Sequence, residues 1–187
     1  GIAIGIAMCQ DGLFVAFHSY NDTLVAGPGD QYVVDVLLRD RQNGVTEGAS
    51  TSGDTGVFEG NCFQSSISAT GRFVGFTADD SFDGDTNGFT GDAVVFDRQL
   101  DSATVVSRNS AGVQADDESE TPFVSEDGTI VVFTSRGSNL AANDTNNLYD
   151  VFRRVGGVTE RIAADDDTFG FHAVGSGMSP DGLVVSL

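Results

Sequence analysis

The sequence predicts an all-β fold built from tandem copies of one repeat, and three observations point to it. A glycine-containing tight turn followed by an apolar strand recurs four times with a period of about 57 residues. Two further strand-like runs follow each of the first three turns. No stretch has the periodicity of an amphipathic helix. The four turns begin at Asp11, Thr70, Asp127 and Asp181.

The turn and the strand after it read DGLFVAF, TGRFVGF, DGTIVVF and DGLVVSL in the four copies. The glycine supplies the positive φ that a tight hairpin turn requires. The β-branched and aromatic residues that follow fit a pleated, buried surface. Each copy therefore predicts a turn that leads into a buried strand.

The other strands of the repeat keep the same spacing. A run that starts with aspartate follows the first strand after a polar loop, at 35–41, 92–98 and 150–155. A third run starts at Gly44, Ala103 and Gly157. A short segment precedes the turn, as at 65–69 and 121–125. Each repeat therefore predicts four short antiparallel strands.

Four antiparallel strands in a repeat of this length are typical of the blades of a β-propeller. Residues on both faces of the predicted strands are apolar, which favours an arrangement in which each blade packs against its neighbours. A β-sandwich or β-solenoid is the alternative, although the period is long for a solenoid coil. We predict one β-propeller fragment over 1–187, with blade-like repeats at about 10–68, 69–125 and 126–179 and a further copy starting at 180–187.

Three blades and part of a fourth are fewer than the about four to eight blades that typically close a propeller. The ring is therefore expected to be incomplete within this chain. Residues beyond both ends, or further copies of the chain, would complete it, and an open blade edge favours pairing. We expect a homo-oligomer if the chain is stable alone.

The succession DG-x-x-V-x-F-T-S, N-L, D-T-N, D-V-F and G-V-T-E-R, clearest at 127–162, resembles the repeat of TolB-like bacterial β-propellers, which are WD-repeat-like. The resemblance implies four-stranded blades around a central channel. It also implies roles in protein association, or as non-catalytic modules of periplasmic and secreted proteins. The first repeat departs from the pattern, because 27–35 lacks the Asp-Thr-Asn element.

The charge of the chain disfavours two classes of partner. All 9 basic residues are arginine, against 28 acidic residues, and the net charge is -19. Such a surface repels nucleic-acid phosphates and anionic lipid headgroups. The apolar opening GIAIGIAM is too short to span a membrane and is predicted to be a buried strand. We expect no nucleic-acid partner and no membrane insertion. The acid excess fits a solvated face, adaptation to salt or cation binding.

The loop DGDTNGFTGD suggests a calcium site. Asp83, Asp85 and Asn87 alternate along the chain and Gly88 follows them, as in calcium loops, where a hard cation needs several converging oxygens. Asp92 could close the shell of ligands. No Glu occupies the twelfth position, so the loop is not an EF-hand. The alternative is an Asx-turn that only shapes the backbone.

The corresponding loop of the third repeat offers Asp144, Asn146 and Asp150 as calcium ligands. Ala142 stands there in place of the first ligand, so this candidate set is smaller. Ca²⁺ is the only cofactor that the sequence suggests.

No catalytic motif emerges from the sequence. No Gly-x-Ser-x-Gly elbow occurs, and His18 and His172 alternate with apolar neighbours, which is typical of strand residues. Cys9 and Cys62 form no Cys-x-x-Cys motif, and we expect buried thiols, with a disulfide as the alternative.

These observations predict a non-catalytic binding or scaffolding module whose ligand, a protein or a small molecule, is unknown. The alternatives are the propeller portion of a secreted hydrolase, either a glycosidase or a prolyl-oligopeptidase-like peptidase, and a calcium-stabilised extracellular module. The expected location is periplasmic or secreted.

Overall fold

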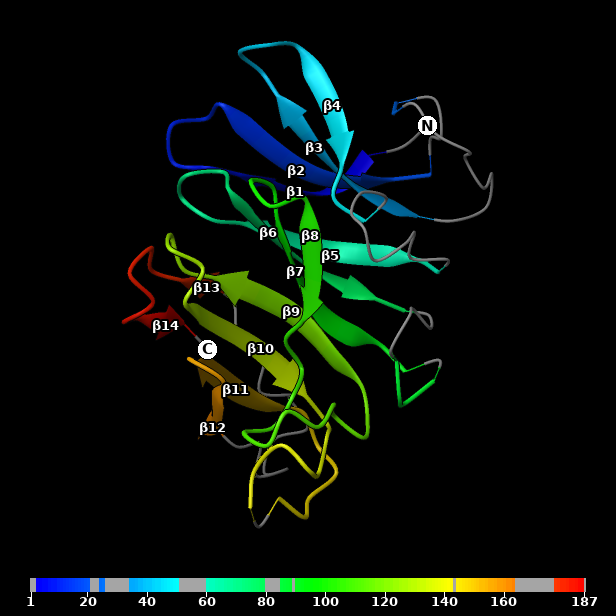
Figure 1. Ribbon diagram of the computed structural model, residues 1–187, viewed down its shortest axis with the longest axis vertical. Coiled ribbons are helices and arrows are strands. Elements are labelled where there is room, and N and C mark those ends of the chain that lie inside the picture. The colour runs from blue at the N-terminus through cyan, green and yellow to red at the C-terminus, as the bar shows by residue number, and fades with distance from the viewer. Residues whose placement is uncertain are drawn as a thin grey trace.

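The computed structural model describes residues 3–20, 24–25, 34–50, 60–79, 85–88, 90–142, 144–163 and 177–186. These residues form three four-stranded antiparallel sheets and one two-stranded sheet, and they contain no helix (Figure 1). The predicted all-β fold with four-stranded, blade-like repeats is confirmed. No closed ring forms among the described strands.

Each sheet is a meander of consecutive strands, and we call the three large sheets blades 1, 2 and 3. Blade 1 comprises β1 (Ala3–Met8), β2 (Phe14–Ser19), β3 (Asp35–Asp40) and β4 (Val45–Gly48). Blade 2 comprises β5 (Cys62–Ile67), β6 (Phe73–Ala78), β7 (Asp92–Asp97) and β8 (Ser102–Val105). Blade 3 comprises β9 (Ser119–Val124), β10 (Ile130–Ser135), β11 (Asp150–Val155) and β12 (Val158–Ala163). The C-terminal hairpin comprises β13 (Gly177–Met178) and β14 (Val185–Ser186).

The sheets begin one strand earlier than the repeats read from the sequence. Position 69, where the second repeat starts, falls between β5 and β6, which pair in one sheet. The period of the repeat is the same in both descriptions. Only the starting point differs, because the sheet includes the strand that precedes the turn.

The meander sorts the connections to two ends of the stack. The glycine turns after β1, β5 and β9 lie at the same end as the turns that join the third and fourth strands, and we call this the turn end. The longer loops after β2, β6 and β10 lie at the opposite end, together with the connections between blades. We call this opposite end the loop end.

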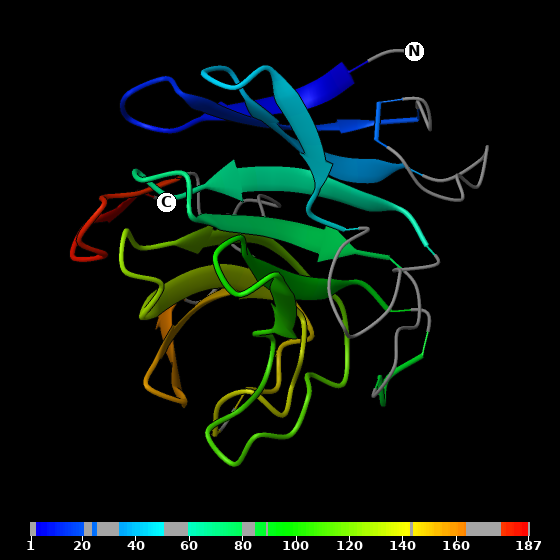
Figure 2. The same ribbon diagram turned by 45° about the horizontal axis from the view of Figure 1, so that its top comes forward.

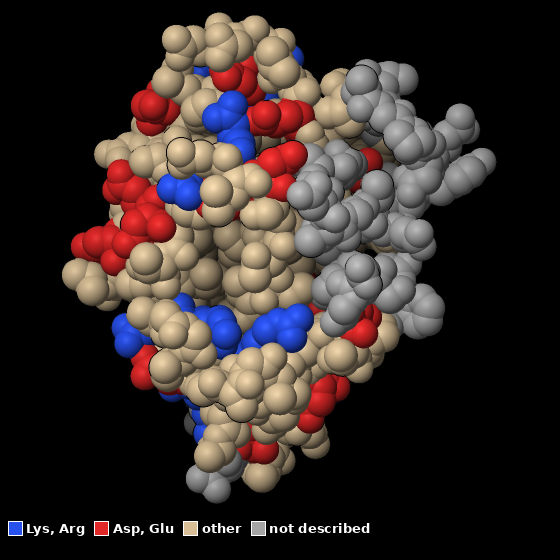
Figure 3. Space-filling model, viewed as in Figure 1, with Lys and Arg blue, Asp and Glu red and all other residues tan. Residues whose placement is uncertain are grey.

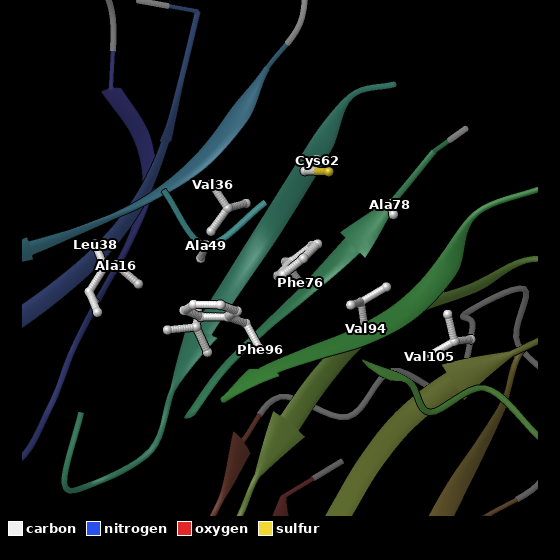
Figure 4. Packing of buried hydrophobic residues seen from close by; sticks show 11 residues of the cluster. Ala16, Val36, Leu38, Ala49, Cys62, Phe76, Ala78, Val94, Phe96 and Val105 are labelled. Carbon is white, nitrogen blue, oxygen red and sulfur yellow. The ribbon is translucent and has the colours of Figure 1, made fainter. Parts of the chain in front are cut away.

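The core lies between the blades, which stack face to face (Figure 2). Between blades 1 and 2, Phe76 and Phe96 pack against a cluster that includes Ala16 and Leu38 (Figure 4). Between blades 2 and 3 a second cluster includes Phe73 and, from blade 3, Phe133 and Phe152, whose rings lie 5.8 Å apart. Blade 2 therefore buries apolar side chains on both faces, which explains why its two central strands, β6 and β7, are apolar on both sides.

The first strand of each blade contains a bulge at the same place. The residues at this place are Gly5, Gln64 and Thr121, with φ of 62°, 55° and 50°, and each lies beside a register shift with the second strand. Positive φ is unusual for Gln and more so for β-branched Thr. Only the first copy marks the bulge with glycine.

The expectation that the opening strand is buried is wrong. Residues 3–8 do form a strand, but Ile6 is 70% exposed and Met8 is 61% exposed. The reason is that no described sheet covers the outer face of blade 1, whereas blade 1 itself covers the equivalent face of blade 2.

At the turn end each blade fits closely onto the one before it. A Cβ built on Gly71 would lie 2.3 Å from Phe14 of the preceding blade, and one on Gly128 would lie 2.4 Å from Phe73. Both glycines also have positive φ, 75° and 76°. Two independent constraints therefore select glycine in this turn: the positive φ of its backbone and the close approach of the neighbouring blade.

We predict that Gly71→Ala destabilises the fold more than Gly12→Ala. Both positions have positive φ, which costs an alanine about 1–2 kcal/mol. Gly71→Ala adds overpacking against Phe14, about 1–3 kcal/mol. The nearest atoms to a Cβ on Gly12 are side-chain ends of Arg41 and Met8, at 3.5 Å. Urea unfolding measures both free energies, and equal losses would contradict the close blade contact.

Candidate functional site

The candidate site is at the loop end of blade 2, where three predicted calcium ligands converge on one nitrogen. Nε2 of Gln114 donates to side-chain oxygens of Asp92 at 2.7 Å, Asp85 at 3.0 Å and Asn87 at 3.1 Å. Asp83, the fourth predicted ligand, lies outside the described residues. The spacing of the loop therefore does gather its described oxygens, and an amide group occupies the point at which they meet.

The orientation of the Gln114 amide follows from its other hydrogen bonds. Oε1 of Gln114 accepts from both the backbone N and the Oγ1 of Thr86, at 3.1 Å each. If the amide were reversed, its NH₂ group would face the donating N–H of Thr86. The donor nitrogen of Gln114 is thus directed towards the loop oxygens.

The loop also contains the backbone turn that was the alternative to a metal site. Oδ1 of Asp85 accepts from the backbone N of Asn87 at 2.9 Å, which is an Asx-turn. Nδ2 of Asn87 donates to the carbonyl of Ala115 at 3.0 Å. Such bonds shape the loop with or without a cation, so the calcium site stays a prediction.

Asp92 is the most buried acid of this group, at 1% exposed. Burial raises the pKa of Asp92, while hydrogen bonds from Ser107 and Gln114 oppose the shift. One oxygen of Asp85 is also buried, and it has no hydrogen-bond partner among the described residues. The site therefore holds negative charge that its hydrogen bonds only partly compensate.

Blade 3 places an arginine at the equivalent point. Nη1 of Arg161 lies 2.7 Å from Oδ2 of Asp150 and 3.4 Å from Oδ1 of Asp144. Nδ2 of Asn146 lies 3.4 Å from Oδ1 of Asp150. Burial raises the pKa of Asp144, and the nearby charge of Asp150 adds to the shift. In this blade the guanidinium supplies the positive charge between the two carboxylates.

Sequence reasoning missed both central residues. Gln114 belongs to the connection between β8 and β9, and Arg161 lies on β12, so neither is part of the loop motif. Their separations from their aspartate partners, 22 and 11 residues, differ between the blades. No local spacing could have identified them.

The other candidate groups lie apart from these loops. Cys9 and Cys62 are buried free thiols, as expected, and burial raises the pKa of Cys62. His18 lies on β2, and burial lowers its pKa. His172 falls outside the described residues.

Two features are absent from the described part of the chain. Within it, no three His, Cys, Asp or Glu side chains lie close enough to hold a metal ion. That part also contains no helix of the length and hydropathy needed to cross a bilayer.

The calcium prediction is tested by thermal melts in calcium, in magnesium and in chelator. A ligand at about 100 times its dissociation constant stabilises a protein by about 2.7 kcal/mol, so calcium alone should raise the melting temperature. Asp92→Asn is the matched variant, because an amide can keep the bonds to Ser107 and Gln114 while losing the charge; it should abolish the calcium effect. Equal melting temperatures of the unmodified chain in all three buffers would contradict the calcium prediction.

Several solved structures are similar to this chain, and one of them is a β-propeller domain. TolB from Acinetobacter baumannii matches with 18% identity and a TM-score of 0.57, over 97% of this chain and 36% of TolB. The tricorn protease matches with 15% identity and a TM-score of 0.52, over 82% of this chain and 13% of the protease. The β-propeller domain of the Trilobed protease from Pyrococcus furiosus matches with 12% identity and a TM-score of 0.51, over 86% of this chain and 43% of that chain.

No family model matches the chain, and no curated protein sequence matches it significantly. The chain spans about a third of the length of the TolB structure, 36%. At these identities the likeness carries the fold and not the activity. The chain has a TolB-like β-propeller fold, and its described residues form three stacked blades of that fold.

Proposed function

We propose that the chain is a non-catalytic propeller module that binds a partner protein at the loop end of blades 2 and 3. The observation that carries this proposal is a network of hydrogen bonds that ties the loops of the two blades into one surface. Loops held over a stack of rigid sheets are the usual place for a binding site.

The connection between β8 and β9 forms the centre of this network. Gln114 and Ala115 hold the blade 2 loop through the bonds described above. Nδ2 of Asn139, which follows β10, donates to the carbonyl of Gln114 at 2.8 Å. Oγ of Ser138 donates to Asp116 at 2.8 Å. The loop surface therefore continues across the border between blades 2 and 3.

Charge favours a basic partner. The chain carries a net charge of -19, and acidic side chains are distributed over the face shown in Figure 3, with arginines in smaller groups among them. Opposite charge raises the rate of association and selects between partners more than it raises affinity. A protein with a basic surface fits this end best.

A protease-associated role is the alternative, because two of the similar structures are proteases or their propeller domains. In that case the propeller would serve a hydrolase carried elsewhere in a longer chain. We also propose a periplasmic or secreted location, which rests on the resemblance of the repeat to TolB-like propellers.

We predict that arginine substitutions at the loop end abolish partner capture. Ala142 and Thr145 are exposed in the β10–β11 loop, so Ala142→Arg with Thr145→Arg reverses local charge without disturbing the core. The control is Leu100→Arg, at a turn-end position that is 68% exposed. Capture from cell extract by the immobilised chain, compared between variants by mass spectrometry, is the measurement. Capture that survives the loop substitutions but not Leu100→Arg would place binding at the other end.

A further inference from the structure

We propose that the outer face of blade 1 binds a second copy of this chain head to tail, through the C-terminal hairpin of that copy. This surface is distinct from the loop end, so the inference does not rest on the proposed function. It rests on the internal repeat, because the same positions in blades 2 and 3 already hold a preceding blade.

The outer face of blade 1 contains a pocket. Its lining residues are Ile6, Val15, Phe17, Arg39 and Arg41. The two arginines are exposed and the apolar residues are only partly buried or exposed. An apolar floor with two cations at its border is suited to a partner that is apolar in the centre and acidic at the rim.

Arg41 occupies in blade 1 the position of Arg98 in blade 2. Their backbone N atoms donate to equivalent carbonyls, those of Leu13 and Arg72. Arg98 reaches the preceding blade: it forms an ion pair with Glu47, and its guanidinium carbon lies 4.3 Å from the centre of the Phe14 ring.

Arg98 also lies 3.7 Å from Asp40, the last residue of β3 in the preceding blade. Across the border between blades 1 and 2, the side chain of Arg98 thus contacts two acidic side chains and one aromatic ring. The same residue type at position 41 has no such neighbour among the described residues.

Arg39 occupies the position of Arg154 in blade 3. Arg39 pairs with Val15 and Thr46 across its two neighbouring strands, and Arg154 pairs in the same way with Val131 and Thr159.

Nη1 of Arg154 donates to Thr159 Oγ1, and it also donates to the carbonyls of Arg108 and Asn109 in the chain that leaves the preceding blade, at 2.8 and 3.2 Å. Nη1 of Arg39 donates to Thr46 Oγ1 at 3.0 Å. The outer face of blade 1 therefore repeats an arrangement that elsewhere in this chain receives a blade.

In so acidic a chain, a basic side chain without an ion-pair partner is unexpected. The chain contains 9 basic residues against 28 acidic ones, yet neither Arg39 nor Arg41 forms an ion pair within the described residues. A second copy carries the same acidic surface, so its charge complements this face locally.

The turn end shows which part of the second copy fits. The glycine of one turn contacts the residue two positions after the glycine of the previous turn in three pairs, Gly71 on Phe14, Gly128 on Phe73 and Gly182 on Ile130. Within the described chain, two positions of this series lack the contact that the others make.

These two are Gly12 and Val184. Among the described residues, a Cβ built on Gly12 would meet within 4 Å only Arg41 and Met8 of its own blade. Val184 is 66% exposed beside Leu183 at 74%. Placing Val184 of one copy on Gly12 of another would add a fourth contact of the same kind. The interface would be heterologous, since different faces of the two copies meet.

The test uses two single variants and their mixture. Ile6→Glu puts an acid on the outer face of blade 1, and Val184→Glu puts one on the hairpin; both positions are largely exposed, so folding should be retained, and circular dichroism checks this. Sedimentation velocity over a range of concentrations should show self-association of the unmodified chain. Each variant should weaken it at least about tenfold.

The mixture gives the decisive result. The Ile6→Glu chain keeps a sound hairpin and the Val184→Glu chain keeps a sound blade 1 face, so the two together should form a dimer that neither forms alone. Leu100→Glu, at a position 68% exposed and in neither face, is the control and should associate like the unmodified chain.

Three outcomes would overturn the proposal. A chain that stays monomeric at every concentration has no such interface. Association that only Ile6→Glu weakens indicates two blade 1 faces in contact with each other. A mixture that fails to dimerise, although both variants are folded, excludes the head-to-tail arrangement.

Discussion

The packing of one blade on the next is the interaction on which the rest of this structure depends. Blade 2 directs Val74 and Phe76 towards blade 1, and Phe73 and Val95 towards blade 3. A single four-stranded sheet with two apolar faces cannot remove both from water, because it has no second layer of its own. Burial therefore comes from neighbouring copies of the repeat, and a face without a neighbour stays open, as on β1.

Stacking also explains where the functional groups lie. The turn end is packed tightly, since the turn glycines Gly71, Gly128 and Gly182 each contact a side chain of the preceding blade. The loop end is free to vary, and there polar residues bond to one another across blades, as Asn139 does with Gln114 and Ser138 with Asp116. A rigid turn end and a polar loop end are consequences of the same meander, which sends short turns one way and long loops the other.

The sequence was a good guide to the fold because the fold is a repeat. Each turn-plus-strand unit gave the same weak signal, and recurrence at a constant period made the signal strong. Features that depend on contacts between distant residues were not accessible. The bulge at Gln64 and Thr121 carries no glycine, and the donors Gln114 and Arg161 come from outside the loops that they organise. The exposure of Ile6 was missed for a related reason, since an apolar strand looks the same whether or not a neighbour covers it.

Native-state hydrogen exchange, resolved by residue, tests the stacking account most directly. Amides of β6 and β7 belong to the blade that is covered on both faces, so they should open only with global unfolding. Amides of β1 and β2 belong to a blade whose outer face no described sheet covers, and at concentrations where the chain is monomeric they should exchange faster. Equal protection of β2 and β6 in the monomer would mean that each sheet is stable by itself, and would contradict the account.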